Sequence, residues 1–182
     1  GFHRSCAHRP SVLAEEMGRT LTASPFLSTS ILAATALNKY ASEAAKSEYL
    51  PKIAGADIVM ALAVDEGRKH GPASIAMKAE KSGNGFKLSG SKTFVADGHV
   101  ADKIIVAART GGAPGEEAGI SLFLVDAKAK GVARERTFMV DSRNAARVIF
   151  DNVAVTGDDV IGEIDNGYMA LEGVLSAGRA GL

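Results

Sequence analysis

The spacing of apolar residues changes twice along this 182-residue chain, and that change limits the fold more than any single motif does. Over about residues 11–55, apolar side chains recur at helical spacing, as in FLSTSILAATALNKY. Over about 56–162, short apolar runs and alternating stretches such as GFKLSGSKTFV predict strands, with Gly-rich turns between them. From about 163 the helical spacing returns. We therefore expect an α+β fold: part of a helical domain at 1–55, a middle antiparallel β-barrel or sandwich domain at 56–162, and the start of a C-terminal helical domain at 163–182.

Two of the expected helices carry more specific predictions. One begins at Ser42 and is expected to end before Pro51, because proline disfavours helical backbone in the residue before it. The last helix places the apolar side chains Tyr168, Leu171, Val174 and Leu175 along one face. No later segment is left to cover this face, so we interpret the chain as truncated and expect its helical domain to continue past Leu182.

The stretch SGSKTFVADG, residues 89–98, poses a question about one aromatic side chain. Strict alternation places Leu88, Lys92 and Phe94 on one face, and the strand then stops at a tight Asp97-Gly98 turn. Phe94 therefore either packs in the sheet core or lies against a flat group that is not protein.

Composition excludes several function classes. Lys plus Arg equals Asp plus Glu, at 21 each, which argues against nucleic acid as a partner. The single cysteine, Cys6, excludes an internal disulfide and suits a reducing compartment. The longest apolar run, 58–64, is too short to span a bilayer, and no secretory signal or zinc spacing is visible. We expect a cytoplasmic protein without metal, membrane span or nucleic acid.

Several stretches carry a resemblance through their order and spacing: EEMGRTLTASPFLST, SEAAKSEYLPKIAGADIVMALAVDE, KAEKSGNGFKLSGSKTFVADGHVADKIIVAART, GISLFLVD and VIFDNVAV followed by VIGEIDNGY. From residue 11 onward the sequence resembles the acyl-CoA dehydrogenase family. The resemblance implies FAD as cofactor and α,β-dehydrogenation of an acyl-CoA thioester, as in fatty acid β-oxidation.

The resemblance also implies which residues face the flavin. Phe94 takes the position of the aromatic beside the ring, and Ala96 replaces the usual Thr near the reactive nitrogen. A second segment, residues 64–66, matches the family's segment whose backbone faces the pyrimidine edge of the flavin. Asp65 and Gly67 stand here where the family usually has Thr and Pro. The expected cofactor residues are Val64, Asp65, Glu66, Phe94, Val95 and Ala96.

Substrate contacts are implied at two further positions. His70 falls near the usual Ser of a Gly-Ser-Asp stretch, which RKHGP replaces here, and Arg179 matches an Arg of the first C-terminal helix. The residue before Arg179 is Gly178, so the alternative position for a catalytic Glu is not filled. We expect the base beyond Leu182 and expect the isolated chain to be inactive.

Other functions stay open. The same fold serves acyl-CoA oxidases and flavin monooxygenases, and the departures at Asp65 and Ala96 also fit a divergent non-catalytic subunit of a hetero-oligomeric acyl-CoA dehydrogenase. A non-enzymatic β-domain binding module is an alternative of another class. As a dehydrogenase, the expected partners are an acyl-CoA substrate, electron-transfer flavoprotein or a similar acceptor, and further subunits of a homo- or hetero-oligomer.

Overall fold

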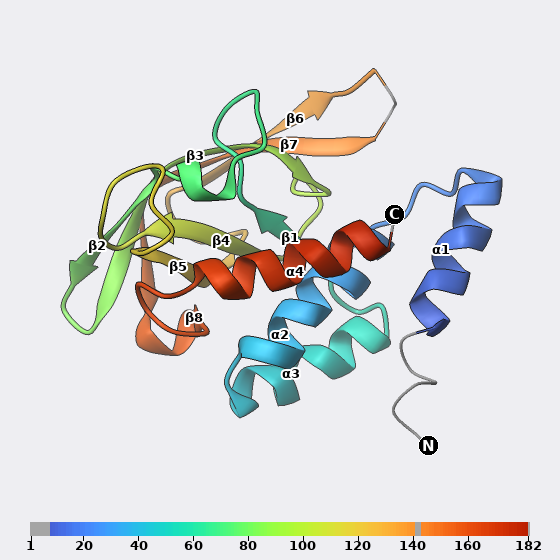
Figure 1. Ribbon diagram of the computed structural model, residues 1–182, viewed down its shortest axis with the longest axis horizontal. Coiled ribbons are helices and arrows are strands. Elements are labelled where there is room, and N and C mark those ends of the chain that lie inside the picture. Colours follow the sequence, from blue (N-terminus) through green and yellow to red (C-terminus); the bar gives the residue numbers. More distant parts are fainter. Residues whose placement is uncertain (1–7, 141–142, 182) are drawn as a thin grey trace.

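The computed structural model describes residues 8–140 and 143–181 (Figure 1). Helices come first and last in the chain, and strands occupy the middle. The helical elements are α1 (His8–Thr20), η1 (Phe26–Ala33, a π-helix), α2 (Ala34–Tyr40), α3 (Glu43–Ala54), the short 3₁₀ turns η2 (Pro72–Ser74) and η3 (Gly157–Asp159), and α4 (Tyr168–Ala180). The strands are β1 (Met60–Ala63), β2 (Lys78–Ser82), β3 (Gly85–Ala96), β4 (Lys103–Arg109), β5 (Ile120–Asp126), β6 (Val132–Phe138), β7 (Asn144–Thr156) and β8 (Val160–Ile161).

Helix α3 begins as the sequence predicts but ends later. The Ser42 hydroxyl caps its first turn by accepting from the Ala45 backbone N–H at 3.3 Å. The predicted end before Pro51 is wrong, because the helix continues through this proline to Ala54. Leu50 and Ile53, on either side of Pro51, both pack against the core, and this packing outweighs the backbone hydrogen bond that proline removes.

The fold class is confirmed in its helix–sheet–helix plan, and the sheet itself is open and mixed. The strand order is β6-β7-β3-β2-β4-β5-β8, with β1 added beside β4. Most neighbours are antiparallel, but β1 and β2 both run parallel to β4. The expected closed barrel is therefore not formed: no pairing between β6 and β8 joins the two ends of this order among the described strands.

The core has two layers because β4 is buried on both faces. Ile105 and Ala107 point toward the helices, and Ile104 and Val106, which alternate with them, point toward the layer formed by β3 and β7. Every residue of β4 after Lys103 is buried. A run of apolar residues without polar alternation is what a doubly covered strand requires.

The apolar face of α4 is covered within this chain, which corrects the expectation that it lacks a partner. Leu171 and Val174 are fully buried in the core shared by η1, α2, β1 and β5. In Figure 1, α4 passes in front of α2, and it contacts η1, α2 and β5. Among the described residues, no helix combines the length and apolarity that crossing a bilayer requires.

Strand β1 sets the position of the loop that follows it. On one side it pairs with β4, and at its start the Thr29 side chain substitutes for a neighbouring strand. The Thr29 hydroxyl donates to the Met60 carbonyl oxygen and accepts from the Met60 N–H, both at 3.0 Å. The start of β1 is thereby held against η1, four residues before the loop that begins at residue 64.

Candidate functional site

A hollow of about 570 Å³ opens where β1 ends. Its lining is one continuous loop, residues 64–71, together with Ser74 and Ile75 from the turn that leads into β2. The three sequence-predicted residues Val64, Asp65 and Glu66 all line it, and so does His70. The structure thus gathers four of the eight predicted site residues around one space.

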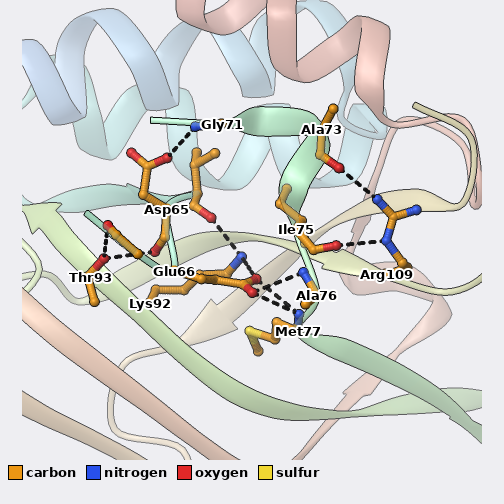
Figure 2. Close-up of polar contacts among 12 residues, drawn as sticks. Asp65, Glu66, Gly71, Ala73, Ile75, Ala76, Met77, Lys92, Thr93 and Arg109 are labelled. Atoms are coloured by element: carbon orange, nitrogen blue, oxygen red, sulfur yellow. Dashed lines mark hydrogen bonds and ion pairs between the residues drawn. The ribbon is translucent and has the colours of Figure 1, made fainter. Parts of the chain in front are cut away.

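A buried ion pair supports the base of this loop (Figure 2). Lys92 on β3 is completely buried, and its Nζ donates to the Val64 carbonyl oxygen at 2.8 Å and to Oε1 of Glu66 at 2.7 Å. The Glu66 carboxylate also accepts from the backbone N–H groups of Ala76 and Met77, at 2.9 and 3.0 Å. Burial lowers the pKa of Lys92, and the neighbouring Glu66 carboxylate opposes that shift. Glu66 therefore closes the two ends of the loop.

The Asp65 side chain turns back onto its own loop. Its carboxylate lies 2.9 and 3.0 Å from Nδ1 of His70 and accepts from the Gly71 N–H at 3.2 Å. The sequence does not specify the direction in which the Asp65 carboxylate points. This direction matters, because a carboxylate that faces the site would repel an anionic ligand. Here its charge is directed at the imidazole of His70.

Phe94 is exposed because of an irregularity in β3. The register between β3 and β7 shifts between Lys92 and Val95, so that Val95 enters the core in place of Phe94. Phe94 is 48% exposed and its φ is +52°, a left-handed conformation that costs a bulky residue about 1–2 kcal/mol. The prediction that Phe94 shares a face with Lys92 is wrong, and ordinary core packing does not account for this aromatic.

The irregular part of β3 lies against the loop of the hollow. Thr93, the residue before Phe94, makes two hydrogen bonds to this loop. Its N–H donates to the Asp65 carbonyl oxygen at 2.7 Å, and its hydroxyl donates to the Gly67 carbonyl oxygen at 3.2 Å. Two segments about 28 residues apart in sequence therefore meet at one point. Ala96 is exposed beyond the buried Val95 and brings no hydroxyl to this surface.

The outer rim of the hollow is basic. Arg68, Lys69 and His70 follow one another on the exposed part of the loop. Neither Arg68 nor Lys69 forms an ion pair or side-chain hydrogen bond with the described residues, so both cations are available to a ligand. A hollow with a cationic rim and a neighbouring exposed aromatic can hold a flat ligand that carries negative charge.

Arg179 lies apart from this cluster. It is exposed near the end of α4 and pairs with Glu172, with Nη1 and Oε2 3.3 Å apart, and it is not among the residues that line the hollow. No group of three or more His, Cys, Asp or Glu residues suited to a metal ion occurs in 8–140 or 143–181. Cys6 lies outside the described residues.

Sequence reasoning did not identify Lys92 and Thr93, which join the two segments. One signal was available for Lys92: a charged residue at a position where the alternation calls for an apolar one. Lysine is almost never fully buried unless it is paired, so this position predicts a buried partner.

Comparison with known proteins assigns the chain to a family. The sequence profile of the acyl-CoA dehydrogenase middle domain matches residues 60–153. The short/branched chain specific acyl-CoA dehydrogenase of Bos taurus is 30% identical over 151 residues, 80% of this chain and 34% of that protein. The 3-(aryl)acrylate reductase of Clostridium sporogenes (strain ATCC 15579) is 31% identical over 142 residues, 75% of this chain and 37% of that protein.

Solved structures agree. The steroid acyl-CoA dehydrogenase Tcur3481-Tcur3483 superposes with a TM-score of 0.85 at 32% identity, over 94% of this chain and 44% of that one. A glutaryl-coenzyme A dehydrogenase in complex with glutaryl-CoA gives 0.85 at 25% identity, over 94% and 46%. The chain spans about a third of the length of the curated relatives given above and less than half of these two solved chains.

Proposed function

Because this chain belongs to the acyl-CoA dehydrogenase family, we propose that it forms the flavin-facing part of an FAD-dependent acyl-CoA dehydrogenase. One observation carries the proposal: the exposed, left-handed Phe94 is held beside a hollow whose rim carries Arg68, Lys69 and His70. We assign residues 1–55 to part of an N-terminal helical domain, 56–162 to the middle β domain and 163–182 to the first helix of a C-terminal helical domain.

The residues present fit FAD in shape and charge. Phe94 offers an exposed aromatic face at no further cost in core packing, and a flat ring against it gains about 0.5–1.5 kcal/mol beyond the buried area. The free cations Arg68 and Lys69 suit the pyrophosphate of the cofactor. The fit lacks one group, since Ala96 has no hydroxyl to donate near the reactive flavin nitrogen.

Each assigned residue of this chain has a binding or orienting role in the proposal. The backbone of Val64, Asp65 and Glu66 borders the cofactor edge, and the exposed residues Phe94 and Ala96 border its ring. Val95, whose side chain is buried in the core, contributes only backbone and holds these two residues in place. When bound, FAD supplies a hydride acceptor. Strained backbone such as that of Phe94 concentrates at ligand sites, where the surrounding structure holds it in place.

Substrate binding is assigned to His70 and Arg179. Nδ1 of His70 donates to the Asp65 carboxylate, so that Nε2, when protonated, can donate to an anionic part of an acyl-CoA. Arg179, on α4, is the second assigned contact. The base that removes the α-proton must be a carboxylate free to accept it. Glu66 and Asp65 are engaged by Lys92 and His70, and Glu172 pairs with Arg179, so we place the base outside these 182 residues and expect the isolated chain to be inactive.

Partners and location follow as proposals. One solved neighbour is titled as an electron transferring flavoprotein of Acidaminococcus fermentans, and another as a complex of two different chains, ChsE4 and ChsE5. We propose that electrons leave to such a flavoprotein and that the chain works in a homo- or hetero-oligomer. A single cysteine suits a reducing compartment, and we propose the cytoplasm.

A second candidate is a divergent subunit that holds FAD but performs no chemistry. It is favoured by Asp65 and Ala96, which stand where the family usually has Thr. Such a chain would stabilise an active partner in a hetero-oligomer.

The first test is the visible absorption spectrum of the purified chain, with and without added FAD. A bound-flavin spectrum supports the proposal, and a folded chain that binds no flavin contradicts it.

Anaerobic addition of acyl-CoA thioesters of different chain length and branching then separates the candidates. Because the base is placed outside these 182 residues, neither candidate predicts bleaching by this chain alone. In a chain extended past Leu182, bleaching of the flavin indicates dehydrogenation, whereas a bound flavin that no thioester bleaches favours the divergent subunit. Peroxide formed from oxygen would indicate an oxidase.

A further inference from the structure

Arg109, the last residue of β4, is an almost buried cation without a carboxylate partner. It is 6% exposed and forms no ion pair among the described residues. Its guanidinium instead donates to the carbonyl oxygens of Ile75 (2.7 Å), Ala73 (3.0 Å), Gly111 (3.2 Å), Glu116 (2.9 Å) and Ala118 (2.9 Å). All five N–H groups of an arginine are used in this way.

These acceptors belong to two different segments. Ile75 lines the hollow, and Ala73 lies two residues before it in the same turn; Figure 2 shows the carbonyls of both pointing at Arg109. The other three carbonyls lie in the Gly-rich loop between β4 and β5. One direct bond also joins the segments, from the Gly115 N–H to the Ala73 carbonyl oxygen at 2.8 Å. Arg109 therefore connects the wall of the hollow to a loop that does not line it.

Regular secondary structure gives the wall little support. Between Glu66 and Ala76 the only regular element is the three-residue turn η2. Glu66 closes the base of this loop and Asp65 ties its outer part at His70 and Gly71. The Ile75 side chain is buried in the core, and the carbonyls of Ala73 and Ile75 accept from Arg109, with the Gly115 N–H as a second donor to Ala73. A fork of fixed geometry suits this task, because it sets the distances between several carbonyls at once.

We propose that Arg109 is a positioning residue for the hollow, which acts on ligand binding through the 73–75 wall and the 111–118 loop. This inference rests on the proposed function, in which FAD is the ligand of the hollow. Lysine cannot substitute: its ammonium has three donors on a flexible stem and reaches at most part of the acceptor set.

The test compares Arg109→Lys with Arg134→Lys in the full 182-residue chain. Arg134 on β6 is a matched control, because it also clamps backbone carbonyls, those of His99 and Ala101 at 3.2 and 2.8 Å, away from the hollow. Amide hydrogen exchange and FAD affinity are measured for both variants. For Arg109→Lys we expect exchange at Ser74 and Gly115 to accelerate, and the FAD dissociation constant to rise, by about tenfold each. Arg134→Lys should leave both values within about twofold of the parent chain.

Two outcomes overturn the inference: unchanged exchange at Ser74 and Gly115, or protection lost equally throughout β4 and β5, which would mean a general structural role. Arg109→Ala adds a second test. Millimolar methylguanidinium should restore FAD affinity to this variant and should not change the FAD affinity of Arg134→Ala. If it does not restore the affinity of Arg109→Ala, the result counts against the proposal. If the parent chain binds no FAD, the proposed function fails, and the exchange data alone still decide whether Arg109 positions the wall.

Discussion

Nζ of Lys92 lies 2.7 Å from Oε1 of Glu66, and this contact connects the irregular part of β3 to the loop that forms the hollow. The ammonium is fully buried, while the carboxylate is 21% exposed and also accepts two backbone N–H groups. The exposed aromatic Phe94 lies two residues beyond Lys92. The pair therefore fixes the distance between the two segments assigned to the cofactor.

Replacing Lys92 with Met should destabilise the chain and weaken ligand binding. Glu66 then lacks its cation, and removing one partner of a buried pair costs about 3 kcal/mol. Urea denaturation measures the loss, and FAD titration should show a higher dissociation constant. Replacing exposed Lys81 on β2 with Met serves as the control and should change stability by less than about 0.5 kcal/mol. A Lys92→Met chain as stable as its parent would contradict the role given to the pair.

The same residue predicts a dependence of stability on alkaline pH. Because burial lowers the pKa of Lys92, the folded chain releases this proton at a lower pH than the unfolded chain, whose lysine titrates near 10.5. Between these two values the unfolded state binds more protons, so the free energy of unfolding rises with pH there and is flat below. Lys92→Met lacks this term, so the stability difference between parent and variant should widen toward pH of about 10. A constant difference would show that the pKa is not lowered.

Phe94→Asn should separate stability from function. Asn tolerates the left-handed region, so relief of strain should leave stability unchanged or raise it by about 1 kcal/mol. Loss of the aromatic face should raise the FAD dissociation constant by about tenfold. Phe138→Asn is the control, since Phe138 is 85% exposed and lies on β6, which β7 separates from β3. Equal effects of both variants on FAD would remove Phe94 from the site.

Asp65→Ala and His70→Ala should act on binding as one unit. Side-chain exposure of 24% and 48% limits the stability lost to less than about 1 kcal/mol. Both variants remove the Asp65–His70 contact, and Asp65→Ala also removes the acceptor of the Gly71 N–H. Both should therefore weaken FAD binding, and the double variant should be little worse than Asp65→Ala alone. Glu43→Ala, which breaks an exposed pair with Lys46 on α3, should have no effect on binding. Additive effects would mean that the two side chains act separately.

Charge reversal at the rim should weaken binding in a salt-dependent manner. Arg68→Glu with Lys69→Glu should raise the FAD dissociation constant by about tenfold at low salt and by less at high salt, because exposed charges are screened. The same reversal at Lys81 and Lys87, exposed on the β2–β3 hairpin, provides a control of equal net charge. A similar loss in both chains would indicate a general electrostatic effect and no specific rim.

Much of the fold follows from local patterns in the sequence. The change from helical spacing to alternation separates the helices from the strands, because side chains recur every 3.6 residues in one and every two in the other. The start of α3 at Ser42 is visible in the sequence in the same way. The sequence also indicates the segments around residues 64–70 and 94–96, through a resemblance carried by their order.

The tertiary structure decided how those segments meet. The outward turn of Phe94 depends on the register of β3 against β7, which no local pattern specifies. The direction of the Asp65 carboxylate, the burial of Lys92 beside Glu66 and the five carbonyls around Arg109 depend on residues distant in sequence. The same holds for α4, whose apolar face finds its partner in η1 and α2, more than 120 residues earlier in the chain. Local propensity fixes the type of an element, whereas its partners are selected by packing between elements, which only the folded chain contains.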